Sequence, residues 1–138
     1  MEGTPSNPEI EVLIARFFSA FDNRNGAVPR LRDVTDCFTD KATIVHRTEA
    51  GTELYSPAEF ASPRIELLTG GTLLGFHEWE VSSATQVFDG IAARISRYRK
   101  VGFLNGSEYA GSGTKCFQLA EVGVGWRIAS LAWVDESP

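Results

Sequence analysis

The sequence predicts an α+β domain in which three helices cover one face of a mainly antiparallel sheet. The helical signals lie in the first half of the chain, where apolar residues recur at spacings of three and four. From residue 74 onward the pattern changes to long runs typical of strands. An Asp-Gly turn at 89–90 and a glycine-containing turn at 123–125 help to divide these runs into a meander of four strands.

The first helix is predicted to begin at Asn7-Pro8-Glu9. Asn can cap a helix, Pro suits the first helical position, and Glu favours the positive end of the helix dipole. The helix carries one wide apolar stripe, formed by Ile10, Leu13, Ile14, Phe17, Phe18 and Phe21. Asn25-Gly26 is expected to end the helix. A stripe with three Phe side chains packs most naturally on a sheet.

A second, shorter helix is predicted over 29–38. The β-branched residues in 42–47 then indicate a strand, and 48–55 is expected to form a polar loop or a weak hairpin. Four further strands are expected after the third helix, at 75–88, 91–103, 109–122 and 125–134.

The third helix is predicted to start at Ser56-Pro57-Ala58-Glu59, which has the pattern of a capping box with Pro at the first helical position. Gly70-Gly71 is expected to end it. Pro63 lies inside this segment, where proline removes one hydrogen bond and clashes with a preceding carbonyl. The helix is therefore expected to kink or to split into two pieces.

Length and composition limit the class of protein. At 138 residues the chain suits a single domain spanning 1–138, with 1–7 expected to be flexible. A net charge of −5 argues against a nucleic-acid partner. No secretion signal or membrane span is recognisable, and the two cysteines lack metal-site spacing, so we expect a cytoplasmic protein with reduced thiols and no membrane contact.

The Asp89-Gly90 turn predicts the register of the strands that it joins. A two-residue type I′ loop places Phe88 opposite Ile91. Counting back by twos gives the further pairs Ala84–Ile95, Ser82–Arg97 and Glu80–Arg99. Strict alternation then places apolar residues on opposite faces at the two ends of the hairpin. This conflict predicts either a β-bulge or strands that extend beyond the helices near the turn.

The order of elements, the aromatic-rich first helix and a last strand with the sequence Gly125-Trp126-Arg127-Ile128-Ala129-Ser130-Leu131-Ala132-Trp133 together resemble the NTF2-like superfamily. Within it the chain resembles small SnoaL-like and DUF4440-like proteins, over about 9–136. The resemblance implies a strongly curved sheet with the helices over its concave face, a conical cavity between them, and frequent homodimers formed through the sheet.

The resemblance leaves function open, because the superfamily includes ketosteroid isomerases, polyketide cyclases, dehydratases and non-catalytic modules. The isomerases place a Tyr on the first helix, where this chain has only Phe. The cyclases and dehydratases use an Asp or His pair in the cavity. This chain has two His, and no Asp falls inside a predicted strand; Asp89 lies in a turn.

His46 is the best candidate for a titratable group in the cavity. It follows Ala42 and Ile44 on the same side of a predicted strand, so it faces the cavity if those two residues face the core. There it would act as an acid or base, or serve only as a hydrogen-bonded structural side chain. No metal or cofactor is predicted, because His46 and His77 are distant and supply too few ligands.

The remaining pocket residues are expected to be aromatic. The predicted lining consists of Phe17, Phe21 and Phe60 from the helices, and Trp79 and Tyr98 from the sheet. The alternative is that Trp79 and Tyr98 form a dimer interface. A homodimer is expected because both faces of the last strand are apolar. One face carries Trp126 and Ile128, and the other carries Leu131 and Trp133.

Three functions remain open from the sequence. The first is a domain that binds a small apolar or aromatic molecule in its cavity. The second is a cofactor-independent isomerase, cyclase or dehydratase with an acid–base residue in that cavity. The third is a dimerisation module with a filled core.

Overall fold

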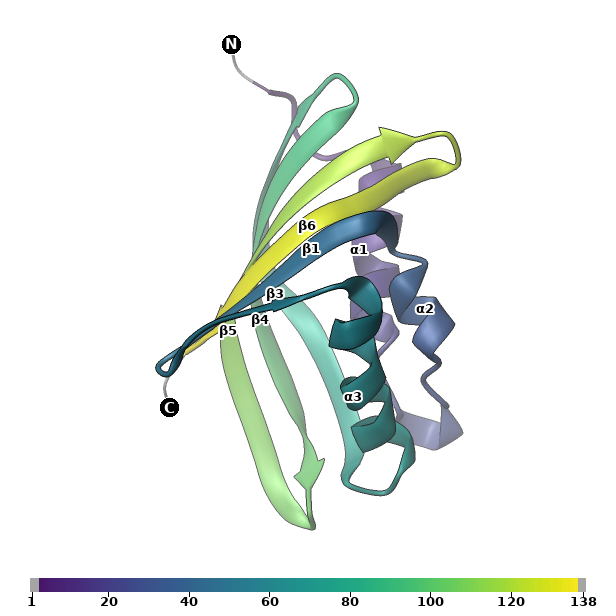
Figure 1. Cartoon of the computed structure of the whole chain (residues 1–138), viewed down its shortest axis with the longest axis vertical. Helices are drawn as coiled ribbons and strands as arrows, with labels where there is room; N and C mark the ends of the chain where they lie inside the picture. The colour runs from purple at the N-terminus through teal and green to yellow at the C-terminus, as the bar shows by residue number, and fades with distance from the viewer. Residues whose placement is uncertain (1–2, 137–138) are drawn as a thin grey trace.

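A single curved sheet carries three helices on one of its faces (Figure 1). The computed structural model describes residues 3–136. The helices are α1 (Pro8–Ser19), α2 (Leu31–Thr35) and α3 (Pro57–Thr69), with a short 3₁₀ turn at Arg24–Gly26. The strands are β1 (Phe38–Thr48), β2 (Gly51–Tyr55), β3 (Leu73–Phe88), β4 (Ile91–Leu104), β5 (Ser107–Val122) and β6 (Gly125–Asp135). The predicted fold class is confirmed.

The six strands lie in the order β2-β1-β6-β5-β4-β3. The pairing of β1 with β6 is parallel, and every other pairing is antiparallel. The polar segment before α3 forms a hairpin, with β2 at the edge of the sheet. Because β1 and β6 are far apart in the chain, their parallel pairing joins the helical half to the meander.

Local sequence signals set the starts of α1 and α3. The Asn7 side chain accepts a hydrogen bond from the Ile10 amide, and Ser56 and Glu59 form the expected capping box. The prediction that Asn25 ends the first helix is wrong, because α1 ends at Ser19 and a separate 3₁₀ turn follows. The helix α3 continues through Pro63 as one element, so of the two predicted outcomes, a kink or a split, the split does not occur.

Asn23 gives the physical reason for the early end of α1. Its side-chain amide donates to the carbonyls of Leu68 and Leu73, and its side-chain oxygen accepts from the Phe76 amide. These bonds require the chain to leave the helix and reach the junction between α3 and β3. One polar side chain thereby joins three elements at one end of the helical layer.

The hydrophobic core lies between the helices and the concave face of the sheet. The Phe17 ring lies at its centre, with aromatic neighbours from four elements at centroid distances of 5.4 to 6.5 Å. These neighbours are Phe18, Phe21, Phe38, Phe60 and Phe117. The apolar stripe of the first helix therefore faces the sheet, as predicted.

A β-bulge at Val81 changes the face that each half of β3 presents. The pairs Phe88–Ile91, Ala84–Ile95 and Ser82–Arg97 form as predicted. Beyond the bulge, Glu80 lies opposite Tyr98 instead of Arg99. The predicted bulge is confirmed, and it also reverses the expected assignment of faces: Glu80 now faces the helices.

A second bulge in β6 overturns the prediction of an apolar surface on both faces of the last strand. The register shifts between Ile128 and Ser130, which leaves Ala129 without a partner. The apolar side chains before and after the bulge therefore point to the same face of the sheet. All four of them are buried in one core: Trp126, Ile128, Leu131 and Trp133.

The N-terminal segment contacts the hairpin of β3 and β4. The amide and carbonyl of Thr4 pair with those of Val87 at 2.9 and 2.7 Å. Part of the segment predicted to be flexible is thus hydrogen-bonded, and Met1 and Glu2 lie outside the described residues.

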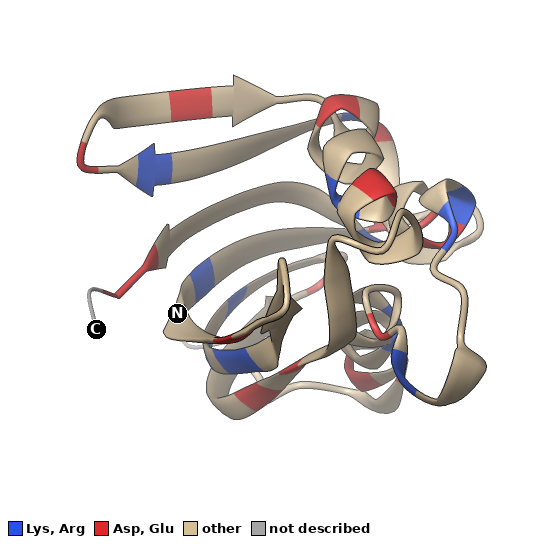
Figure 2. Ribbon diagram, turned by 90° about the horizontal axis from the view of Figure 1, so that it is seen from below, with Lys and Arg blue, Asp and Glu red and all other residues tan. Residues whose placement is uncertain are grey.

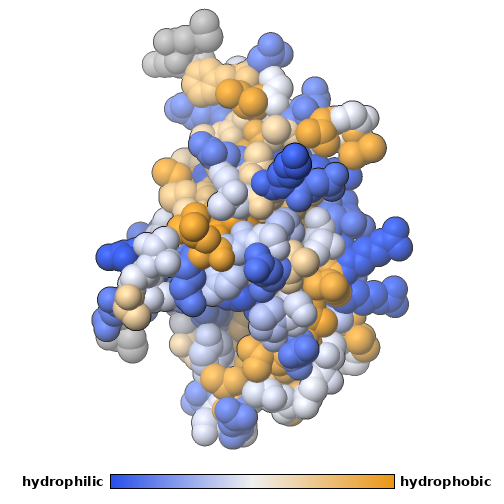
Figure 3. Space-filling view, viewed as in Figure 1, coloured by the Kyte–Doolittle hydropathy of each residue, from blue (hydrophilic) through white to orange (hydrophobic). Residues whose placement is uncertain are grey.

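Charged and apolar residues are mixed over the surface. Figure 2 shows acidic and basic residues interspersed on helices and strands. On the face seen in Figure 3, apolar side chains form small groups separated by polar ones. Within residues 3–136, none of the helices combines the length and apolar character needed to span a bilayer.

Candidate functional site

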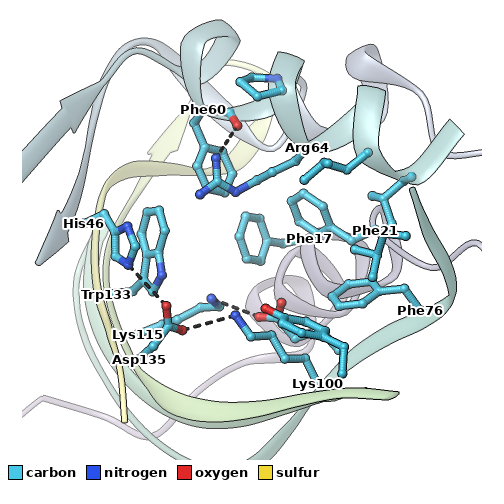
Figure 4. Close-up of a pocket in the computed structure, with 16 residues that line it drawn as sticks. Phe17, Phe21, His46, Phe60, Arg64, Phe76, Lys100, Lys115, Trp133 and Asp135 are labelled. Carbon is cyan, nitrogen blue, oxygen red and sulfur yellow. Dashed lines mark hydrogen bonds and ion pairs between the residues drawn. The ribbon is translucent and has the colours of Figure 1, made fainter. Parts of the chain in front are cut away.

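A cavity of about 350 Å³ lies between α1, α3 and the concave face of the sheet (Figure 4). Its apolar and aromatic lining consists of Phe17, Phe21, Phe60, Pro63, Leu67, Leu68, Leu73, Phe76, Tyr109 and Trp133. Its ionisable lining consists of His46, Arg64, Glu78, Lys100, Lys115 and Asp135. The cavity thus combines an aromatic wall with a group of charged side chains.

The aromatic wall comes from both layers of the fold. Phe60 of α3 packs edge-on against Trp133 of β6 with ring centroids 5.4 Å apart, and it stacks on Phe17 of α1 at 6.5 Å. Such offset and edge-on contacts are favoured between aromatic rings. They fix the shape of the wall on three rigid elements.

The charged side chains at the floor form two ion pairs. Lys115 Nζ lies 2.9 Å from Glu78 Oε1, at angles outside hydrogen-bond geometry. Lys100 Nζ donates to Asp135 Oδ1 at 3.2 Å. Burial lowers the pKa of Lys115, whereas the adjacent Glu78 carboxylate opposes that decrease. The Lys115 ammonium also lies 3.9 Å from the ring centroid of Tyr98.

His46 lies at the side of the cavity, where its ring stacks on Trp133 with centroids 4.1 Å apart. Its Nε2 is 3.2 Å from Asp135 Oδ2, and its Nδ1 is 3.4 Å from Glu53 Oε1. The parallel register places His46 beside Trp133, so Asp135 lies two residues further along β6. His46 therefore has the carboxylate partner that sequence analysis did not find.

Arg64 enters the cavity from α3. Its Nη1 donates to the Phe60 carbonyl one turn earlier at 2.8 Å. The guanidinium carbon lies 4.3 Å from the ring centroid of Phe60 and 5.1 Å from that of Trp133. Burial lowers the pKa of Arg64, although the guanidinium remains charged throughout the range in which proteins are folded.

The structure brings together four of the six predicted pocket residues. Phe17, Phe21, His46 and Phe60 line the cavity. Tyr98 is buried on the concave face and donates to Asp135, but it lies beneath Lys115 and does not line the cavity.

Trp79 does not line the cavity, contrary to the prediction. It stacks on His77 and points to the opposite face, because Phe76 and Glu78 of the same strand face the cavity. The bulge at Val81 causes this reversal.

The charged part of the lining was not predicted from the sequence. The sequence held one signal that Lys115 faces inward. In a strand it shares a face with the apolar residues Phe117 and Leu119, which follow it at spacings of two. Asp135 was missed because the last strand was predicted to stop at residue 134. Among residues 3–136, no three His, Cys, Asp or Glu side chains are placed to hold a metal ion together.

This architecture, with helices over the concave face of a curved sheet and a cavity between them, is the NTF2-like fold. An NTF2-like superfamily protein from Salmonella enterica matches 94% of this chain and 90% of its own length, with a TM-score of 0.74 and 17% identity. The hexachlorocyclohexane dehydrochlorinase LinA-type3 from Novosphingobium barchaimii matches 94% of this chain and 85% of its own, with a TM-score of 0.69 and 12% identity.

A protein from Exiguobacterium sibiricum that bears the name of a Ca/calmodulin-dependent kinase II association domain matches 99% of both chains, with a TM-score of 0.71 and 10% identity. No protein-family model and no curated protein matches the sequence. At these identities the structural matches establish the fold alone, and the chemistry of the cavity depends on its own residues.

Proposed function

We propose that this protein binds a small, largely apolar or aromatic molecule in the cavity. The supporting observation is an aromatic wall around about 350 Å³ of space, a volume within the range of small-molecule sites. A dimerisation module with a filled core fits this cavity poorly. Aromatic rings on α1, α3 and β6 offer a rigid surface on which a flat ligand stacks at little cost in side-chain entropy.

Calorimetric titration with the neutral aromatic 2-naphthalenemethanol tests this function. Leu67 lines the cavity and is 40% exposed, so Leu67→Trp is expected to fill the space and abolish saturable binding. Leu54 is 67% exposed on β2 and does not line the cavity, so Leu54→Trp is the matched control and is expected to bind normally. Failure of the wild-type protein to bind, or equal binding by both variants, would contradict the proposal.

The contact between His46 and Asp135 favours a second candidate, a cofactor-independent isomerase, cyclase or dehydratase. Asp135 next to Nε2 orients the imidazole, and Nδ1, which Glu53 Oε1 flanks at 3.4 Å, is the nitrogen left to accept a proton from a bound substrate. The stacking of His46 on Trp133 holds the ring at the cavity wall.

Hydrogen exchange at the α-carbon of 2-tetralone in D₂O, followed by NMR, tests this second candidate. The wild-type protein is expected to accelerate exchange above the buffer rate, and His46→Gln is expected to remove the acceleration while binding of 2-naphthalenemethanol persists. Exchange at the buffer rate in the wild-type protein would count against proton abstraction.

The proposed assembly is a homodimer of cytoplasmic protomers, formed through the outer face of the sheet. Exposed apolar side chains on that face support it, among them Ile95 at 54% and Phe103 at 49% exposure. The two thiols are free: Cys37 is buried and Cys116 is exposed, which fits a reducing compartment.

A further inference from the structure

We infer that the cavity selects ligands that carry a carboxylate on an aromatic body, and that Arg64 binds this carboxylate. The inference rests on the proposed binding function and specifies the class of ligand. The relevant features are a guanidinium without an anionic partner, an excess of positive charge in the lining, and aromatic rings that hold the guanidinium in place.

Arg64 has most of its hydrogen-bonding capacity unused. A guanidinium offers five N–H donors, and the Phe60 carbonyl is the acceptor that the described residues provide. Within residues 3–136, no carboxylate lies within 4.0 Å of this guanidinium. A charged group that is partly removed from water and unpaired is costly, so an incoming anion gains more here than at an exposed arginine.

The charges of the lining leave one cation in excess. With His46 counted as neutral at pH 7, Lys115 pairs with Glu78 and Lys100 pairs with Asp135, so these four charges balance. Arg64 is the remaining cation. The cavity is thus locally positive, although the whole chain carries a net charge of −5. One excess positive charge matches a singly charged carboxylate and falls short of a doubly charged phosphate.

The surrounding rings position the guanidinium for a flat anion. Figure 4 shows Arg64 reaching into the cavity from α3, with Phe60 and Trp133 beside it. Stacking against aromatic faces leaves the in-plane N–H groups of an arginine available, and their fork fits the two oxygens of a carboxylate. An aromatic acid bound in this way directs its ring toward the wall that includes Phe17.

The test compares 2-naphthoate with its neutral isostere 2-naphthamide by calorimetric titration at pH 7. The wild-type protein is expected to bind the acid at least about tenfold more tightly than the amide, because a charge-assisted hydrogen bond contributes on that scale. Arg64→Met is expected to remove this preference while the affinity for the amide changes less than about threefold. Arg32 is 85% exposed and does not line the cavity, so Arg32→Met is the control that keeps the preference.

A second variant guards against misfolding of Arg64→Met. Arg64→Lys keeps the positive charge and loses the planar fork, so it is expected to retain only part of the preference for the acid. Equal affinities of the wild-type protein for acid and amide, or a preference that survives in Arg64→Met, would overturn the inference and leave the proposed binding function standing. Absence of binding by both compounds would overturn the proposed function, and this inference with it.

Discussion

At the scale of single residues, Arg94 has the most buried charge outside the cavity. Its side chain is 2% exposed and forms ion pairs with Glu80 and Glu11. Its Nε donates to Glu80 Oε2 at 3.0 Å, and its Nη1 donates to Thr85 Oγ1 at 2.9 Å. Because Glu11 belongs to α1, this one guanidinium connects the first helix to β3 and β4. Buried charges of this kind are tolerated only when they are fully paired.

Arg94→Met is expected to lower the free energy of unfolding by roughly 3 kcal/mol, because it leaves the carboxylate of Glu80 poorly solvated and unpaired. Urea denaturation followed by circular dichroism measures the loss. Arg97 on the same strand is 57% exposed and pairs with Glu136, so Arg97→Met is the control and is expected to cost less than about 1 kcal/mol. Equal losses for the two variants would contradict this account of Arg94.

The same cluster predicts a dependence of stability on pH. The hydrogen bond from Arg94 holds the pKa of Glu11 below its ordinary value of 4.5. Because the folded-state pKa lies below the unfolded value, Glu11 stabilises the fold above pH 4.5, and this contribution is lost as the pH falls through the folded-state pKa. The difference in unfolding free energy between the wild-type protein and Glu11→Gln is therefore expected to shrink between pH 7 and pH 3. A difference that stays constant over this range would argue against the linkage.

At the scale of elements, Asn23 connects the segment that follows α1 to α3 and β3. Asn23→Ala removes two donated hydrogen bonds and one accepted bond, and it leaves the partly buried carbonyls of Leu68 and Leu73 without this donor. We expect the free energy of unfolding to fall by about 2–3 kcal/mol, as measured by urea denaturation.

Gln118→Ala is the matched control for Asn23→Ala. The Gln118 side chain is exposed and accepts one hydrogen bond from Ser130, so its loss is expected to change stability by less than about 0.5 kcal/mol. If Asn23→Ala proved as mild as Gln118→Ala, the junction of the three elements would depend on packing alone.

The two bulges decide which side chains each strand presents to the helices. Without the extra residue at Val81, Glu80 would share a face with Arg97 and Arg99. Without the extra residue at Ala129, Trp126 would lie on the face opposite Trp133. One inserted residue reverses the facing of everything beyond it, because side chains alternate with a period of two.

At the scale of the whole molecule, the proposed homodimer gives a prediction about mass. Ile95 lies on the outer face, opposite Ala84 on one side and Cys116 on the other. A charge placed there would be desolvated in an interface, so Ile95→Asp is expected to shift the protein from dimer to monomer.

Sedimentation equilibrium at micromolar concentration measures the shift. Val124 is 76% exposed in the turn between β5 and β6, outside the strand β4 that carries Ile95 and Phe103. Val124→Asp is therefore the control and is expected to leave the dimer intact. A monomeric wild-type protein would rule out the proposed assembly.

The sequence by itself determined the features that depend on neighbours along the chain. The caps at Asn7 and Ser56 predicted two helix starts, and the Asp89-Gly90 turn predicted the register of β3 and β4 as far as Ser82. Alternation in the first strand predicted that His46 faces the cavity. Each signal acts over a few residues, where hydrogen bonds and steric limits of the backbone decide the conformation.

Only the tertiary structure decided the composition of the cavity. The parallel pairing of β1 with β6 brings Asp135 to His46, and the bulge at Val81 turns Glu78 toward Lys115 while it directs Trp79 outward. Those contacts join residues that are 37 to 89 positions apart in the chain. Their partners are selected by packing between layers and by bulge positions, which no local pattern in one sequence specifies.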